Sequence, residues 1–218
     1  MMMNEEYINK YIRSILRQST GLLKELEQYA EANHIPIIKP EVAHLLIVLG
    51  RLVKPAKILE IGTAIGYSSI LLSGVLTPGG KIDTVEKQEE MLFKARENIK
   101  RAGLEHTISV IAGDAGDVLE CLEKQYDMIF LDAAKGQYPE LLPDCLRMLR
   151  EGGLLVSDNV LFRGMVASDE LVKRRKKTIV NRMRNYLDTL CSNPSLDTSI
   201  LPVGDGVAVS YKRCSSDQ

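Results

Sequence analysis

The clearest indication of fold in this 218-residue chain is the stretch Glu60-Ile61-Gly62-Thr63-Ala64-Ile65-Gly66-Tyr67-Ser68. It completes an apolar run, Lys57–Ile61, which predicts a buried strand. Gly62 and Gly66 permit a sharp turn and a close approach of a ligand to the backbone. The helix expected to follow would present free N–H groups at its start. The stretch therefore predicts a strand, a turn that binds a ligand, and a helix.

The spacing of the glycines argues against a dinucleotide-binding turn. Such a turn carries G-x-G-x-x-G and faces a pyrophosphate, whereas this one is G-x-x-x-G preceded by Glu60. A pyrophosphate gains nothing from a nearby carboxylate, but a sulfonium cofactor that carries an amino group does. Glu86 ends the next predicted strand, where a carboxylate can accept hydrogen bonds from both ribose hydroxyls. Asp114 can accept from an adenine amino group, cap the next helix, or do both.

On either side of this stretch, short apolar runs alternate with longer amphipathic ones. The predicted strands are Lys57–Ile61, Lys81–Glu86, Thr107–Ile111, Asp127–Leu131 and Leu154–Ser157, and the predicted helices are Ser68–Leu76, Gln88–Ala102, Gly116–Lys124 and Tyr138–Leu149. This alternation is typical of an α/β fold with a parallel, doubly wound sheet. Two final runs, Thr198–Val203 and Val207–Lys212, are joined by Gly204-Asp205-Gly206 and predict an antiparallel hairpin.

The first 55 residues read differently, as a helical N-terminal extension. Apolar residues recur at helical spacing in 7–16 and 22–29, prolines interrupt the pattern, and a third helix is expected over Glu41–Leu52. We predict one domain, 1–218, in which this extension, 1–55, precedes the cofactor-binding core, 56–218. A long helix is also expected from about Ser168 to Leu190, before the hairpin.

Composition narrows the functional class. The net charge of the chain is −1. The overall charge therefore does not indicate binding to a polyanion or to a membrane. The polar start lacks the apolar segment of a signal peptide, so a cytoplasmic protein is expected. The four cysteines lie far apart and form no C-x-x-C pair, which favours reduced thiols over disulfides or a zinc site.

Oxygen-bearing side chains follow two of the predicted strands. Asp132 follows one strand and Asp158-Asn159 follow the next. Ligands bind at the carboxyl ends of strands in open α/β sheets, and neighbouring strands lie roughly 4.8 Å apart. Two carboxylates and an amide suit Mg²⁺, and Mn²⁺ is not separated from it by ligand type. Each of these residues alone would be interpreted as an ordinary turn or cap residue. Together they predict a metal site. Lys135, three residues after Asp132, could act as a base there.

Taken together, these residues resemble the catechol and caffeoyl-CoA type of metal-dependent class I S-adenosylmethionine O-methyltransferase. The resemblance covers nearly the whole chain and is most specific at Glu60–Ser68, Glu86, Asp132–Lys135 and Asp158-Asn159. It implies a seven-stranded, Rossmann-like sheet that ends in an antiparallel hairpin, and it implies a homodimer. It also implies site residues: cofactor contacts at Lys39, Glu60, Gly62, Ser68, Ser69, Glu86, Asp114, Ala115 and Asp132; metal ligands Asp132, Asp158 and Asn159; and catalytic residues Lys135 and Asp132.

One departure from the catechol enzymes concerns the acceptor. They carry bulky residues between the metal aspartate and the lysine, where this chain has Ala133 and Ala134, and the chain contains no tryptophan. A flat aromatic clamp for a free catechol is therefore not expected, and the mouth of the site should be wider.

A basic segment follows the predicted metal site. Residues Arg163–Arg184 include eight basic and two acidic side chains, a local charge of +6 against −7 for the rest. The segment could be the solvated face of a helix or could follow a phosphate backbone. The runs 158–164 and 201–208 resemble the bacterial tRNA 5-hydroxyuridine methyltransferases, which implies binding of a tRNA anticodon arm and methylation of its wobble uridine to 5-methoxyuridine.

Three other functions remain open. The same chemistry could act on a small catechol or a caffeoyl-CoA-like acceptor. A non-catalytic RNA-binding module would have no use for the acidic and amide set at the strand ends. An NAD-dependent oxidoreductase is disfavoured because the G-x-G-x-x-G motif is missing.

Overall fold

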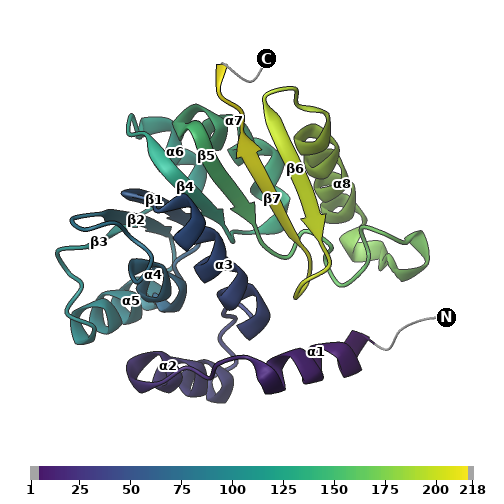
Figure 1. Ribbon diagram of the computed structural model, residues 1–218. Coiled ribbons are helices and arrows are strands. Elements are labelled where there is room, and N and C mark those ends of the chain that lie inside the picture. The colour runs from purple at the N-terminus through teal and green to yellow at the C-terminus, as the bar shows by residue number, and fades with distance from the viewer. Residues whose placement is uncertain (1–4, 216–218) are drawn as a thin grey trace.

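The computed structural model describes residues 5–215 of the chain and contains one seven-stranded sheet (Figure 1). The strand order is β3-β2-β1-β4-β5-β7-β6. Strands β3 to β5 in that order run parallel, and β7 pairs antiparallel with both β5 and β6. The bounds are β1 (Lys57–Ile61), β2 (Lys81–Glu86), β3 (Ile108–Ala112), β4 (Tyr126–Leu131), β5 (Leu149–Ser157), β6 (Leu196–Leu201) and β7 (Val207–Lys212). The predicted parallel sheet with a closing hairpin is confirmed.

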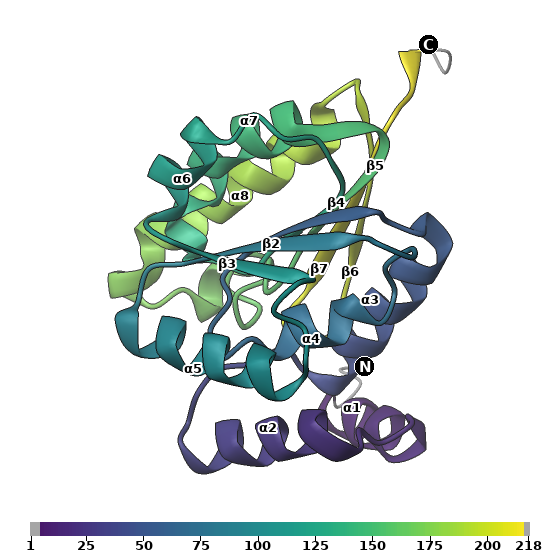
Figure 2. The same cartoon turned by 90° about the vertical axis from the view of Figure 1, so that its left-hand side faces the viewer.

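Helices cover both faces of this sheet, as Figure 2 shows. One face packs against α6 (Ala115–Cys121), α7 (Tyr138–Met148) and α8 (Lys177–Ser192). The other packs against α3 (Pro40–Val53), α4 (Tyr67–Ser73) and α5 (Glu89–Arg101). Two buried apolar clusters result, one on each side, because the central strands alternate between them: Leu59 and Ile61 face one cluster and Ile58 faces the other.

The N-terminal extension adds a layer outside α3 and α4. Helix α1 (Glu5–Ile15) packs on α3, and α2 (Gly21–Ala32) packs on α4. The side chain of Arg13 bonds to the buried Glu41 carboxylate through two nitrogens, at 2.8 and 2.6 Å. This ion pair fixes α1 against the start of α3, beside the end of the sheet where β1 and β4 finish. Residues 1–4 of the predicted extension lie outside the described part of the chain.

Two sequence predictions need correction. The helix predicted from about Ser168 begins only at Lys177, and before it lie two single 3₁₀ turns, η2 (Asp169–Leu171) and η3 (Arg174–Lys176). Five consecutive cations end at Lys177, and crowding of like charges on successive turns disfavours a regular helix through them. Strand β5 starts at Leu149, earlier than predicted, because Leu149 pairs with Tyr126 across a register shift.

Most other boundaries agree with the predicted ones to within one or two residues, although α4 and α6 end three residues early. Among residues 5–215, the structure contains no helix with the length and apolar character needed to cross a membrane.

Candidate active site

A cavity of about 1140 Å³ opens where the parallel strands end. Its walls come from the loops after β1, β2, β3, β4 and β5, from the segment before α3, and from the hairpin turn between β6 and β7. Many of the predicted site residues line it together: Lys39, Gly62, Glu86, Ala115, Asp132, Lys135, Asp158 and Asn159. This is the edge at which open α/β sheets bind ligands.

The glycine turn after β1 forms one wall of the cavity. Gly62 has φ +106°, and a Cβ atom there would lie 2.1 Å from the backbone oxygen of Asp132. Only glycine therefore lets the β1 and β4 ends approach so closely. Gly66 also adopts a positive φ, +82°, directly before α4. The turn predicted from these two glycines is confirmed in its geometry.

Glu86 connects this turn to the next helix. One carboxylate oxygen accepts from the backbone N–H of Ala64 at 2.9 Å, and the other accepts from those of Lys87 and Gln88 at 2.9 Å. The carboxylate is thus oriented by three backbone donors while it faces the cavity. These three bonds use three of the roughly four lone-pair positions of a carboxylate, so one position, on Oε2, stays free for a hydroxyl of the predicted ribose contact.

Asp114 acts as the N-cap of α6. Its side chain accepts from the backbone N–H of Gly116 at 3.1 Å, and this bond, together with Lys87 at 3.4 Å and Gln137 at 3.2 Å, lowers the pKa of Asp114. The capping role considered from the sequence is confirmed. Asp114 does not line the cavity, whereas Ala115 beside it does.

Glu60 lies below the glycine turn and does not line the cavity. It is fully buried, and its Oε2 atom accepts from Thr84 at 2.6 Å and from Ser69. Its Oε1 atom has no hydrogen-bond partner among the described residues. Burial raises the pKa of Glu60 to about 7, against the opposing effect of the serine and threonine hydroxyls. Ser68 and Ser69 are buried too, so cofactor binding by these three residues stays a prediction.

Asp132, Asp158 and Asn159 lie at the ends of β4 and β5 and face one cavity. Asp158 is buried, and its carboxylate accepts from the backbone N–H of Asn159 at 2.7 Å. Burial, followed by the charge of Asp132, raises the pKa of Asp158 to about 7; burial also raises the pKa of Asp132. Asn159 has φ +55°, a left-handed conformation that turns the chain immediately after Asp158.

The donor set fits a divalent cation. Neither carboxylate forms an ion pair within residues 5–215. Burial, and for Asp158 also the charge of Asp132, raises the pKa of these carboxylates by more than the charge of Lys135 lowers it. No three His, Cys, Asp or Glu side chains gather into a metal-binding group in that part of the chain. A third donor to such a cation would be the amide oxygen of Asn159, which lines the same cavity. An all-oxygen set of this kind matches Mg²⁺ or Mn²⁺ better than zinc.

Lys135 sits in η1 (Lys135–Gln137), the turn between β4 and α7. Its ammonium donates to the Asn159 side-chain oxygen at 2.8 Å. An amide oxygen has two lone pairs, so this bond leaves one for a cation. The structure thus places the predicted lysine in direct contact with one of the three predicted metal-ligating residues, Asn159.

Several cavity residues were not predicted. Arg13 and Glu27 come from α1 and α2, and Tyr67, whose hydroxyl donates to Glu27 at 2.6 Å, starts α4. No local motif marks the first two, since they reach the cavity only through the packing of the N-terminal helices. Asp205 could have been expected from the Gly204-Asp205-Gly206 turn: it accepts from the backbone N–H of Arg163 at 2.5 Å and so holds the loop after β5.

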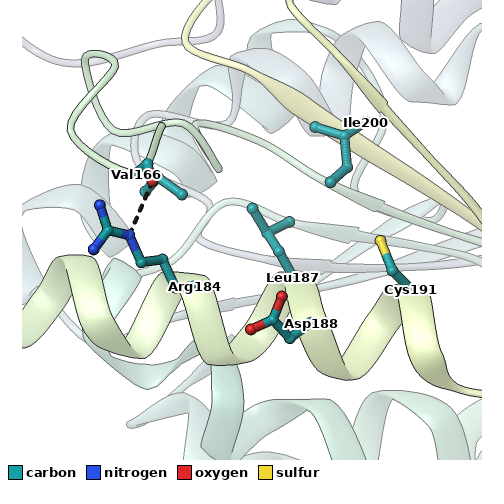
Figure 3. A pocket seen from close by; sticks show the side chains of 6 residues that line it. All are labelled: Val166, Arg184, Leu187, Asp188, Cys191 and Ile200. Atoms are coloured by element: carbon teal, nitrogen blue, oxygen red, sulfur yellow. Dashed lines mark hydrogen bonds between the residues drawn. The ribbon is translucent and has the colours of Figure 1, made fainter. Parts of the chain in front are cut away.

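A second, shallower hollow of about 340 Å³ lies between α8 and β6 (Figure 3). It is lined by Val166, Arg184, Leu187, Asp188, Cys191 and Ile200, and Arg184 closes one end by donating to the Val166 carbonyl at 3.0 Å. None of the predicted site residues lies there. The chemistry-bearing side chains are therefore concentrated in the larger cavity.

Comparisons with known proteins identify the family of the chain. The profile of the O-methyltransferase family matches residues 14–213. A catechol O-methyltransferase of Niastella koreensis is 33% identical over 202 residues, which are 90% of each chain. A caffeoyl-CoA O-methyltransferase of Stellaria longipes is 29% identical and covers 94% of this chain and 90% of its own length.

Solved structures of similar proteins have the same fold. An O-methyltransferase from Bacillus cereus in complex with SAH has a TM-score of 0.84 and 28% identity, covering 95% of this chain and 97% of its own. TomG of Streptomyces achromogenes, an O-methyltransferase of tomaymycin synthesis in complex with SAM, has a TM-score of 0.84 and 27% identity, covering 98% and 100%. With a strand-end cavity, an oxygen donor set and a match over nearly the whole chain, this protein belongs to the O-methyltransferase family.

Proposed function

We propose that the protein transfers a methyl group from S-adenosylmethionine to a hydroxyl oxygen held by a divalent cation, and that the acceptor is 5-hydroxyuridine at the wobble position of tRNA. The observation that carries the chemistry is the meeting of Asp132, Asp158, Asn159 and Lys135 in one cavity with the Gly62 turn and Glu86. The relatives in complex with SAM and SAH support the methyl donor.

In this proposal different cavity residues bind the methyl donor, bind the cation and transfer the proton. Glu86 and Ala115 lie where the nucleoside end of the donor would bind, and Asp132, Asp158 and Asn159 would hold Mg²⁺ or Mn²⁺. Such a cation supplies Lewis acidity, which lowers the pKa of a hydroxyl beside it. In this proposal Lys135 first releases a proton to solvent, and its neutral amine then takes or relays the hydroxyl proton. The oxygen then forms a bond to the methyl carbon as the carbon–sulfur bond breaks, and most of the rate comes from positioning.

A run of five cations supports a polyanionic acceptor. Arg182 and Arg184 of the basic segment are engaged by Glu140 and Asp169. Lys173, Arg174, Arg175, Lys176 and Lys177 are exposed, and none forms an ion pair with the described residues. The Lys176 ammonium lies 5.9 Å from the ring centre of Phe162, which lines the cavity. Lys176 thus connects the run of cations to the cavity, and a phosphate backbone that passes along the run would come close to the site.

The second candidate is a small acceptor, a catechol or a caffeoyl-CoA-like thioester. The names of the relatives favour it, and the phosphates of a coenzyme A moiety could use the same cations. In 5-hydroxyuridine the 5-oxygen and the 4-carbonyl are neighbours, so all these acceptors present two adjacent oxygens to one cation. The cavity of about 1140 Å³, which Ala133 and Ala134 line beside Asp132, has room for a nucleobase.

The deciding experiment measures methyl transfer from labelled S-adenosylmethionine to three acceptors, each with and without EDTA. The acceptors are tRNA bearing 5-hydroxyuridine, caffeoyl-CoA and catechol. EDTA-sensitive labelling of the tRNA, with much lower kcat/KM for the other two, is the expected result. The variant Asp132→Ala should lose transfer to every acceptor while its circular dichroism stays that of the parent; near-normal turnover in this variant would refute the assignment of the metal site.

We also propose that the protein acts as a homodimer. Helix α1 exposes the apolar stripe Tyr7, Tyr11 and Ile15, with exposed fractions of 78%, 63% and 64%. These residues follow i, i+4, i+8 spacing, which puts them on one face of the helix, and exposed apolar stripes of this kind mark contact surfaces. Light scattering after size exclusion tests the proposal: a mass of twice 24.3 kDa is expected, and replacement of Tyr11 with Lys should shift it toward the monomer.

A further inference from the structure

The buried side of the candidate metal site holds a tyrosine to which the proposed chemistry assigns no role. Tyr138 is the first residue of α7 and is fully buried. Its hydroxyl lies 3.1 Å from the carbonyl oxygen of Leu131 and 3.0 Å from that of Asp158. Leu131 immediately precedes Asp132, so one hydroxyl contacts the backbone beside each of the two carboxylates.

This hydroxyl lies where the strand ladder ends. The last backbone hydrogen bond between the two strand ends runs from the Asp158 N–H to the Leu131 carbonyl, at 3.0 Å. Beyond it no strand pairing holds β4 and β5 together. A tyrosine hydroxyl has one hydrogen, which the two carbonyls share. Tyr138 therefore continues the connection between the strands at the point where the two carboxylates leave the backbone.

The ring of Tyr138 is itself held in place. It packs edge-to-face against Tyr186 of α8, with ring centres 5.3 Å apart and an angle of 73° between the planes. The Tyr186 hydroxyl is 2.5 Å from the Oγ atom of Ser157, the last residue of β5. Both rings are fully buried. The hydroxyl of Tyr138 thus has little freedom to follow the strand ends if they move apart.

We infer that Tyr138 is a positioning residue, whose hydroxyl fixes the separation of the β4 and β5 ends and so presets the spacing of Asp132 and Asp158 for a small divalent cation. This inference rests on the proposed metal site. Two adjacent carboxylates repel each other before a cation binds, and Mg²⁺ requires nearly ideal octahedral geometry with short bonds. Backbone that could yield to that repulsion would bind the ion less tightly.

The variant Tyr138→Phe removes the hydroxyl and keeps the ring. Leu131 retains the hydrogen bond from the Asp158 N–H, but the Asp158 carbonyl loses the one partner it has among the described residues. Loss of a partner that orients a metal ligand typically weakens metal binding by roughly 10- to 100-fold. The matched control is Tyr186→Phe, which removes a buried hydroxyl from the same aromatic pair without touching the carbonyls of Leu131 or Asp158.

The test measures Mn²⁺ binding to the full chain by the electron paramagnetic resonance signal of the free ion, with competition by Mg²⁺ and by Ca²⁺. Thermal denaturation of each variant without metal separates loss of fold from loss of affinity. We expect Tyr138→Phe to weaken Mn²⁺ and Mg²⁺ by roughly tenfold or more and Ca²⁺ by less, because Ca²⁺ tolerates variable geometry. The Mg²⁺/Ca²⁺ affinity ratio should fall in this variant and stay unchanged in Tyr186→Phe.

Each other outcome is decisive. If Tyr138→Phe binds Mn²⁺ as tightly as the parent, or if both variants lose all three ions equally, Tyr138 has no positioning role and the inference is overturned. If the parent protein itself binds no Mn²⁺, the proposed metal site fails, and the inference fails with it. Methyl transfer does not enter the measurement, so a mistaken choice of acceptor leaves the result unaffected.

Discussion

Replacing Glu60 with glutamine should make the protein less sensitive to rising pH. Glu60 is fully buried under the glycine turn, and burial raises its pKa from 4.5 to about 7. The folded protein therefore holds this proton more tightly than the unfolded chain does. The stability that results is fully present below pH 4.5 and is lost as the pH rises through about 7.

The size of the effect follows from the shift. Each pKa unit corresponds to about 1.4 kcal/mol, so the shift of Glu60 amounts to about 3 kcal/mol, of which about 2–3 kcal/mol is lost between pH 5 and pH 8. Glutamine carries no charge at either pH. The glutamine variant should therefore gain about 2–3 kcal/mol on the parent between these two pH values. The glutamine also places a buried amide group where Oε1 has no hydrogen-bond partner, which destabilises the variant. This destabilisation is the same at both pH values, so it cancels when the two pH values are compared.

The assay is urea denaturation followed by circular dichroism at pH 5 and pH 8, in EDTA and without cofactor. The measured quantity is the free energy of unfolding of the variant minus that of the parent, compared between the two pH values. Glu97→Gln, on the exposed side of α5, controls for the loss of one charge. If the Glu60→Gln difference is equal at both pH values, the carboxylate is ionised in the folded state throughout, and the argument from burial is wrong.

Three further changes test other parts of the structure. Gly62→Ala should destabilise the protein by about 2 kcal/mol or more in urea denaturation, because the added methyl group meets backbone oxygen at φ +106°. Arg174→Glu combined with Arg175→Glu should lower kcat/KM for tRNA at least tenfold at low salt and leave catechol turnover unchanged; equal loss for both acceptors would contradict the phosphate-binding role. Arg13→Ala should cost about 1–3 kcal/mol in thermal or urea denaturation, because the buried Glu41 carboxylate loses its partner; an unchanged midpoint would show that the ion pair contributes nothing.

The order of strands and helices was predictable because each depends on nearby residues. Apolar β-branched runs mark the buried parallel strands, and glycine spacing marks the turn after β1. The approach of Asp132 and Asp158 to each other was predictable for a related reason. Since the carboxyl ends of parallel strands share one edge, Asp132 and Asp158 had to lie close together once their strands were neighbours.

Residues whose position depends on distant packing were not predictable in this way. Arg13 and Glu27 reach the cavity because α1 and α2 fold back over α3 and α4, and no rule of local spacing records that contact. The start of α8 was misplaced for another reason: the apolar stripe of this helix begins only at Ile179, and the dense positive charge up to Lys177 opposes a regular helix before it.

The face of the sheet on which Glu60 lies could have been predicted from the sequence. Its position just before Gly62 suggested a contact with the cofactor, but strand residues alternate between faces, and Glu60 shares its face with Ile58, which packs under α4. Because helices cover both faces of the sheet, a side chain on either face is buried, and alternation places this carboxylate on the face of Ile58, among the hydroxyls of Ser69 and Thr84. A carboxylate in this position stabilises the turn after β1 through its bonds to Ser69 and Thr84. Its removal should therefore change the stability of the turn more than it changes any direct contact with a ligand.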